Sequence, residues 1–243
     1  MITLKETSWS SLDLFRKCAR KWWYHYISDI QPAFTPVALA FGSGIHSGCQ
    51  AYYKGLAEGR ELRPKNLVRV LENILENDSI QYNGKSKDEH IQMSEKMFEQ
   101  LCSLPKPNKI LGVEQNMEYE VSSDFRIISK IDLLTEDSTG QTIIDFKTAA
   151  KRMNGDADSH GQVSVYSLSN PSARLKFVVF LKTQKGGIEE IETKRNDSQR
   201  KQIVQDFLDF KRQVESDDCT FIRNPSYLCY SCQYKDHCEG RNQ

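Results

Sequence analysis

The chain has 243 residues, of which 38% are hydrophobic and 27% are charged, and its formal net charge is zero. This composition excludes a disordered chain, and no apolar run approaches the roughly 20 residues that span a bilayer. The first residues lack the features of a secretion signal, so we expect no membrane contact and an intracellular location. Without net charge, affinity for nucleic acid must come from local basic patches.

The first hundred residues are predicted to be mainly helical. Apolar side chains at helical spacing predict helices over residues 12–26, 66–82 and 88–104. Another helix is expected after Pro36, with His46 in its first turn. A histidine that opens a helix is more often structural than a metal ligand, so the sequence around His46 leaves its role open.

The first predicted helix combines an apolar stripe with basic side chains. Its aromatic residues suit core packing, and its basic residues fit either a solvated face or a contact with nucleic acid. These basic residues include Arg16, Lys17 and Arg20.

The centre of the chain is predicted to be a β-hairpin with one acidic residue in each strand. Apolar runs over residues 127–134 and 142–146 flank a polar turn. Asp132 lies in the first run and Asp145 in the second, where an unpaired buried carboxylate would be costly. Because side chains alternate along a strand, Lys147 should lie on the same side as Asp145.

Two carboxylates beside a lysine are typical of enzymes that hydrolyse phosphodiesters with a divalent metal ion. Carboxylate oxygens bind Mg²⁺ or Mn²⁺, and the lysine would position or activate the attacking water. The alternative is that the acids flank a surface loop and the lysine forms a weak salt bridge. This stretch alone leaves both interpretations open.

Further strands and helices surround the hairpin. They are a strand over residues 113–121, a helix over 159–168, strands over 175–183 and 188–193, and a helix over 198–215. The preceding strand brings Glu114 close to the hairpin, and Gln162 and Tyr166 lie one helical turn apart. Together these elements predict a mixed α/β (α+β) domain with a central sheet flanked by helices.

Three cysteines near the end of the chain have the spacing of metal ligands. Cys229, Cys232 and Cys238 form a Cys-x-x-Cys-x5-Cys pattern, and Cys18 is the natural fourth ligand. Four thiolates would suit either Zn²⁺ or a four-iron four-sulfur (4Fe-4S) cluster. His237 is a competing zinc ligand.

The order of these motifs resembles the PD-(D/E)XK nuclease superfamily, and within it the RecB-type exonucleases that carry an iron–sulfur cluster. Similar proteins include CRISPR-associated adaptation nucleases, the nuclease domain of AddB and small phage-encoded nucleases. The resemblance runs from the cysteine-bearing first helix through GSGIH, the two strand acids, DFKT and a Q-x-x-x-Y helix to the final cysteines. It therefore covers nearly the whole chain.

The resemblance implies a role for each matching residue. The implied ligands of Mg²⁺ or Mn²⁺ are His46, Asp132, Asp145 and the main-chain carbonyl of Phe146. Lys147 would position the attacking water, with Glu114 as an auxiliary acid. Gln162 and Tyr166 would line the substrate path. The implied ligands of the 4Fe-4S cluster are Cys18, Cys229, Cys232 and Cys238.

The resemblance also implies how the chain is divided. Residues 1–243 would form a single nuclease domain. Segments 1–30 and 220–243 together would form the iron–sulfur subdomain, residues 31–110 a helical part, and residues 111–219 the catalytic core. Two positions depart from the family pattern: Ser129 stands where glycine is usual and Ala19 where proline is usual, and neither change removes a ligand.

The implied function is a metal-dependent DNA exonuclease that acts on DNA ends or single strands. It would serve DNA repair and recombination, phage DNA metabolism or CRISPR adaptation, with DNA as substrate and a helicase or recombination protein as partner. Its implied location is the cytoplasm or nucleoid, or the host cytoplasm if the protein is phage-encoded. One alternative is a non-catalytic module with a degenerate nuclease fold that binds nucleic acid or a protein. Another is a zinc ribbon that serves recruitment at the cysteines.

Overall fold

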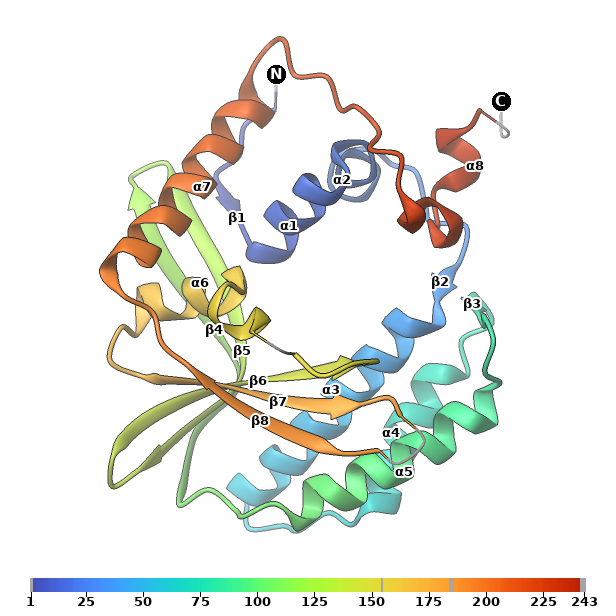
Figure 1. Ribbon diagram of the computed structural model, residues 1–243, viewed down its shortest axis with the longest axis vertical. Helices are drawn as coiled ribbons and strands as arrows, with labels where there is room; N and C mark the ends of the chain where they lie inside the picture. Colours follow the sequence, from blue (N-terminus) through green and yellow to red (C-terminus); the bar gives the residue numbers. More distant parts are fainter. Residues whose placement is uncertain (1, 154, 184–185, 241–243) are drawn as a thin grey trace.

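The computed structural model describes residues 2–153, 155–183 and 186–240, and at its centre lies a six-stranded mixed sheet (Figure 1). The strand order is β1-β5-β6-β7-β8, with β4 also paired to β5. The strands are β1 (Glu6–Thr7), β4 (Lys109–Ser122), β5 (Phe125–Asp137), β6 (Gly140–Ala149), β7 (Arg174–Leu181) and β8 (Ile188–Thr193). The central hairpin is formed by β5 and β6, and the mixed sheet with its flanking helices confirms the predicted fold class.

One edge of β5 is shared by two strands that do not meet. β1 runs parallel to β5 at residues 126–127, and β6 runs antiparallel to it at residues 133–137. The other edge pairs with β4 along most of its length. The stretch of β5 between the two partners therefore borders a gap in the sheet.

The strand β7 is buried on both faces. Its apolar run alternates, so that Val178 and Phe180 pack with α3, α4 and α5, whereas Phe177 and Val179 pack with α6. The helices concerned are α3 (Val37–Ala57), α4 (Pro64–Leu75), α5 (Lys87–Ser103) and α6 (Gly161–Ser169). The sheet thus separates two apolar layers.

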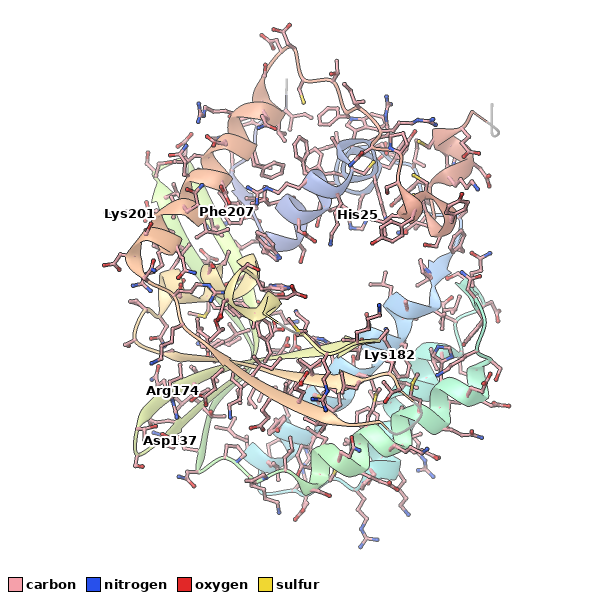
Figure 2. All side chains as sticks on the ribbon, viewed as in Figure 1. His25, Asp137, Arg174, Lys182, Lys201 and Phe207 are labelled. Carbon is pink, nitrogen blue, oxygen red and sulfur yellow. The ribbon has the colours of Figure 1, made fainter. Side chains whose placement is uncertain are left out.

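A third apolar cluster packs near the β1 end of the sheet. It joins α1 (Trp9–Lys17) and α2 (Ala19–Tyr26) to α7 (Asp197–Glu215), whose Phe207 is fully buried (Figure 2). The shorter elements are β2 (Thr35–Pro36), β3 (Ile80–Gln81), the 3-10 turns η1 (Asp156–Asp158) and η2 (Tyr227–Ser231), and α8 (Lys235–Cys238). In the part of the chain that the structure describes, no helix has the length and apolar character needed to cross a membrane.

The single helix predicted over residues 12–26 is wrong, because the chain breaks at Cys18. This residue is extended, with φ −165° and ψ 106°, between α1 and α2. The C-terminal segment supplies partners at the break: the N–H of Arg20 donates to the carbonyl of Ile222, and the N–H of Asn224 donates to Sγ of Cys18 at 3.5 Å. Contacts between Cys18 and residues more than 200 positions later in the sequence therefore determine where α1 ends.

Two other helix boundaries also differ from the prediction. α3 begins at Val37, so His46 lies in the middle of the helix and not in its first turn. The glycines of α3 allow close packing, since a Cβ at Gly48 would lie 2.3 Å from the ring of Phe98. α4 ends at Leu75, and the short strand β3 follows where the helix was expected to continue.

Candidate active site and cysteine cluster

Asp145 and Lys147 lie two residues apart on β6 and point to the same side, as the strand pattern predicted. The side chain of Asp145 is fully buried, and its Oδ2 lies 2.7 Å from Nζ of Lys147. Apart from this ion pair, Oδ2 accepts no hydrogen bond from any described residue. A buried carboxylate oxygen without a hydrogen bond is costly, so it is suited to accept a ligand.

Asp132 lies where β5 and β6 separate. The last paired residues of the hairpin are Leu133 and Ile144. Beyond them, Oδ2 of Asp132 accepts a hydrogen bond of 2.7 Å from the backbone N–H of Phe146, and Nδ1 of His46 lies 3.3 Å from the same oxygen. The carboxylate therefore replaces a ladder bond and connects α3 with both strands of the hairpin.

A chain of hydrogen bonds connects the lysine to the buried acid through α6. Nζ of Lys147 donates to Oε1 of Gln162 at 2.7 Å, and Nε2 of Gln162 donates to Oη of Tyr166 at 2.5 Å. The hydroxyl of Tyr166 donates to Oδ1 of Asp145 at 2.8 Å. Because Gln162 and Tyr166 are one helical turn apart, α6 holds both ends of this chain in fixed positions.

The closely spaced charges change the acidity of the site. Burial raises the pKa of Asp145, Lys147 opposes this shift, and Asp132 adds to it. For His46, burial lowers the pKa, but the hydrogen bond and the charge of Asp132 outweigh burial and leave the pKa raised. The site therefore favours extra positive charge, either as a proton or as a cation.

Glu114 lies on β4, opposite Asp132 of the neighbouring strand β5. Its neighbours Val113 and Gln115 pair with Leu133 and Ile131. The backbone of Glu114 has φ +56°, a left-handed conformation that costs a residue with a side chain roughly 1–2 kcal/mol. Its side chain is 15% exposed and forms an ion pair with Lys130. The structure brings Glu114 near the site but pairs it with a lysine.

The four cysteines of the predicted cluster line one cavity of about 50 Å³ between α2 and the C-terminal segment. Backbone N–H groups point at two of the sulfurs: that of Asn224 donates to Cys18 and that of Ser226 to Cys229, each at 3.5 Å. Among the described residues that line this cavity, His237 is absent, and its ring lies 6.5 Å from that of Tyr24. The arrangement gathers the four thiols and leaves the histidine outside.

Neither site is a complete metal site as it stands. Within residues 2–153, 155–183 and 186–240, no three His, Cys, Asp or Glu side chains form a group able to hold a metal ion. The metal ligands named from the sequence therefore stay predictions. The donor types nevertheless fit their expected groups, because the first site combines the carboxylates of Asp132 and Asp145 with the imidazole of His46, and four thiols line the second cavity.

The basic residues of the first helices do not join the acids. Arg16 forms an ion pair of 2.9 Å with Asp206, and Lys17 forms one of 2.5 Å with Asp13. Arg20 lines the cysteine cavity. Their role in substrate binding stays a prediction.

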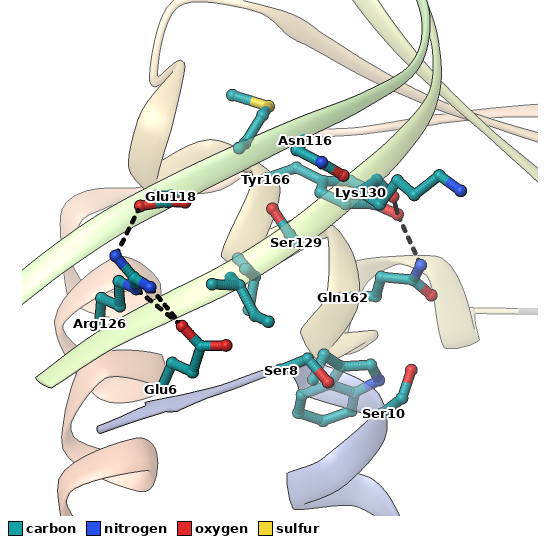
Figure 3. Close-up of a pocket in the computed structure, with 14 residues that line it drawn as sticks. Glu6, Ser8, Ser10, Asn116, Glu118, Arg126, Ser129, Lys130, Gln162 and Tyr166 are labelled. Atoms are coloured by element: carbon teal, nitrogen blue, oxygen red, sulfur yellow. Dashed lines mark hydrogen bonds and ion pairs between the residues drawn. The ribbon is translucent and has the colours of Figure 1, made fainter. Parts of the chain in front are cut away.

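A cavity of about 500 Å³ beside the acids was missed from the sequence (Figure 3). Its lining includes Trp9, Ser129 and Lys130 together with Gln162. Lys130 could have been predicted from the sequence to lie near the site, since it is two residues before Asp132 on the same strand. No sequence pattern indicated Trp9, because its partners are more than 100 residues away in the sequence.

The chain was compared with known proteins. No curated protein sequence matches it. Among solved structures, the protein SSO0001 is 14% identical, with 96% of this chain and 94% of that chain covered and a TM-score of 0.40. A candidate exonuclease from Eubacterium rectale is 10% identical, with 93% and 92% covered and a TM-score of 0.49. Structural similarity at these scores carries no argument for activity.

The sequence model of one family covers almost the whole chain. It is described as the PD-(D/E)XK nuclease superfamily and matches residues 6–239, from β1 to the residue after the last cysteine of the cluster. The matched range contains both acids, the lysine, the Gln-Tyr helix and all four clustered cysteines. This chain belongs to the PD-(D/E)XK nuclease superfamily.

Proposed function

We propose that this nuclease is a Mg²⁺- or Mn²⁺-dependent deoxyribonuclease that removes nucleotides from DNA ends or single strands. The observation that carries the proposal is the buried Oδ2 of Asp145, which accepts no hydrogen bond from the described residues and lies beside Lys147. A fully buried carboxylate oxygen whose only partner is one ammonium is expensive, and it is retained most readily where a bound cation adds to that partner.

The proposed ligands of the cation come from three elements. They are His46 of α3, Asp132 of β5, and Asp145 with the carbonyl of Phe146 on β6. A divalent cation there would offset negative charge on the scissile phosphate and make water a better nucleophile. Glu114 would assist as an auxiliary acid.

Three side chains of the site would position the reacting groups. The ammonium of Lys147 would donate a hydrogen bond to the attacking water or to a phosphate oxygen as the water oxygen bonds to phosphorus and the P–O ester bond breaks. Gln162 restricts the lysine by accepting one of its three N–H groups. Tyr166 fixes the amide of Gln162 relative to the carboxylate of Asp145 by bonding to both. A fixed donor costs less reorganisation during the reaction than a free one.

The cysteines are proposed to bind a structural 4Fe-4S cluster, with Zn²⁺ as the alternative. In support, four thiols surround one cavity and backbone N–H groups point at two of the sulfurs, an environment that suits cluster ligands. The cluster would join α1 and α2 to the C-terminal segment, where Arg16, Lys17 and Arg20 would lie beside the DNA. The proposed partners are DNA and a helicase or recombination protein.

The mode of attack is tested with linear and covalently closed circular single-stranded DNA of one sequence. An exonuclease degrades the linear form with Mg²⁺ or Mn²⁺, leaves the circle intact, and stops when EDTA is added. Cleavage of the circle at a comparable rate would overturn the exonuclease proposal, and digestion in EDTA would overturn metal dependence.

A further inference from the structure

The gap in the sheet beside the acids contains a cavity large enough for one nucleoside. Its volume is about 500 Å³, within the range of small-ligand pockets. The start of α1 forms one wall, β4 and β5 form another, and α6 forms the third (Figure 3). The cavity therefore has three rigid walls.

The cavity shares a wall with the candidate active site. Gln162 lines the cavity, and the same side chain accepts the hydrogen bond from Lys147. Tyr166 also lines it, with Oη 3.3 Å from the carbonyl of Lys130 and 2.8 Å from Asp145. A ligand in the cavity would thus lie one side chain away from the lysine.

The charged groups around the cavity are already paired. Arg126 bonds to Glu6 at the end of the cavity and lies 3.4 Å from Glu118 (Figure 3). Lys130 is paired with Glu114. The positive charges are therefore compensated locally, so the cavity does not favour a phosphate group.

The other groups that line the cavity suit an uncharged, flat and polar ligand. Hydroxyls of Ser8, Ser10 and Ser129 and the amide of Asn116 offer hydrogen bonds, and Trp9 offers an aromatic ring. Nucleobases combine a flat face with donors and acceptors at the edge. Among the parts of a DNA strand, the base fits this lining best.

Trp9 is held in place from the side of α6. A Cβ at Gly161 would lie 2.1 Å from the indole ring, so the ring packs directly on the glycine backbone. The ring of His160 lies 6.2 Å from that of Trp9. The indole is therefore positioned before any ligand arrives, which reduces the entropy lost on stacking.

We infer that this cavity binds the base of a nucleotide next to the scissile phosphate, with Trp9 as the stacking surface. The inference rests on the proposed function, because it assigns a subsite to the same substrate. Stacking on an aromatic side chain tolerates any base, so the subsite would hold the strand in place without selecting sequence.

The test is an equilibrium binding assay with single-stranded DNA that carries one abasic residue, moved stepwise along the strand. The protein carries Lys147→Ala so that DNA stays intact, with and without Trp9→Ala. On normal DNA, Trp9→Ala is expected to weaken binding about tenfold. At one abasic position that loss should disappear, because the base that Trp9 contacts is missing. Trp9→Leu, which keeps apolar volume against Gly161, should give the same pattern if Trp9→Ala folds poorly.

Trp23→Ala provides the matched control, since it removes another half-buried tryptophan that lies outside this cavity. Its effect on affinity should be the same at every abasic position. An equal Trp9 penalty at all positions, or no penalty at all, would overturn the inference. Because the assay needs no cleavage, the expected binding pattern combined with a wild-type protein that cuts DNA under no metal would overturn the proposed nuclease activity alone.

Discussion

The acid–lysine site and the cysteine cluster differ in how much of their geometry exists without a ligand. Asp145 is fully buried, and four hydrogen-bonded or ion-paired contacts tie it, Lys147, Gln162 and Tyr166 together. The clustered cysteines are only partly buried: Cys18 lies between α1 and α2, and the other three lie in or beside the short elements η2 and α8. The first site is built into the sheet, whereas the second joins segments that have little core of their own.

This difference separates chemistry from stability. Removing a ligand group from the sheet site should impair catalysis and leave the fold intact, because strands β5 to β8 pack on both faces without it. Removing a cysteine should loosen the junction of the chain ends if a cluster or metal ion joins them.

The largest effect is expected for Asp145→Asn. Cleavage should fall on the order of 1,000-fold, because a ligand of the cation and the partner of Lys147 are both lost. The melting temperature should not fall. Since burial raises the pKa of Asp145, its ionised form disfavours the folded state at neutral pH, and asparagine removes that cost.

Asp137→Asn is the matched control for this variant. Asp137 ends β5, the strand that carries Asp132, and pairs at the surface with Arg174 (Figure 2). Its replacement should leave cleavage near the wild-type rate. Similar activity losses in both variants would show that the acids do not differ in function.

The next largest effect is expected for Cys232→Ala. Loss of one cluster ligand should lower the free energy of unfolding by about 2–5 kcal/mol, comparable to removing a native cross-link. The measurements are the melting temperature, the iron and zinc content, and the brown colour of anaerobically purified protein. Cys219→Ala, outside the cavity, is the control. An iron-free, zinc-free Cys232→Ala protein of normal stability would contradict a structural role for the cluster.

A smaller effect is expected for Gln162→Ala. The variant removes the acceptor for Lys147 and the donor to Tyr166, so we expect kcat to fall roughly 10- to 100-fold with little change in stability. Gln202→Ala is the control, because Gln202 is exposed and bonds only to Asp206 among the contacts observed. Unchanged kcat in Gln162→Ala would remove this residue from the positioning of the lysine.

The smallest effect concerns pH. Burial, aided by the charge of Lys147, lowers the pKa of His160 to about 4. Between its unfolded value of about 6.5 and that value, the unfolded chain binds the proton and the folded chain does not, so stability falls as pH falls through this window. Denaturation at pH 7 and pH 5 should show that His160→Gln loses less free energy of unfolding over this range than the wild type does. An identical loss in both proteins would contradict this assignment.

The sheet site could be anticipated from sequence because its rules are local. Alternation along β6 predicted that Asp145 and Lys147 share a side, and helical spacing predicted that Gln162 and Tyr166 lie on the same face of a helix. Both pairs are in contact in the structure. Their roles in catalysis stay predictions.

The remaining features depend on contacts between distant segments. The break at Cys18 depends on the chain near Asn224, and the cavity wall at Trp9 depends on Gly161. The left-handed backbone of Glu114 has no signal in its neighbours, since glutamate rarely adopts it. Helix boundaries and the nucleoside-sized cavity therefore could not be predicted from local sequence patterns.

The central claim is that the acid–lysine site cleaves DNA. The direct measurement follows end-labelled linear DNA, single- and double-stranded, with Mg²⁺, Mn²⁺ or EDTA, for the wild type and Lys147→Ala. We predict metal-dependent digestion by the wild type and none by Lys147→Ala, which should remain folded at the assay temperature. Digestion by Lys147→Ala at the wild-type rate, or binding without cleavage by the wild type under every metal, would contradict the claim.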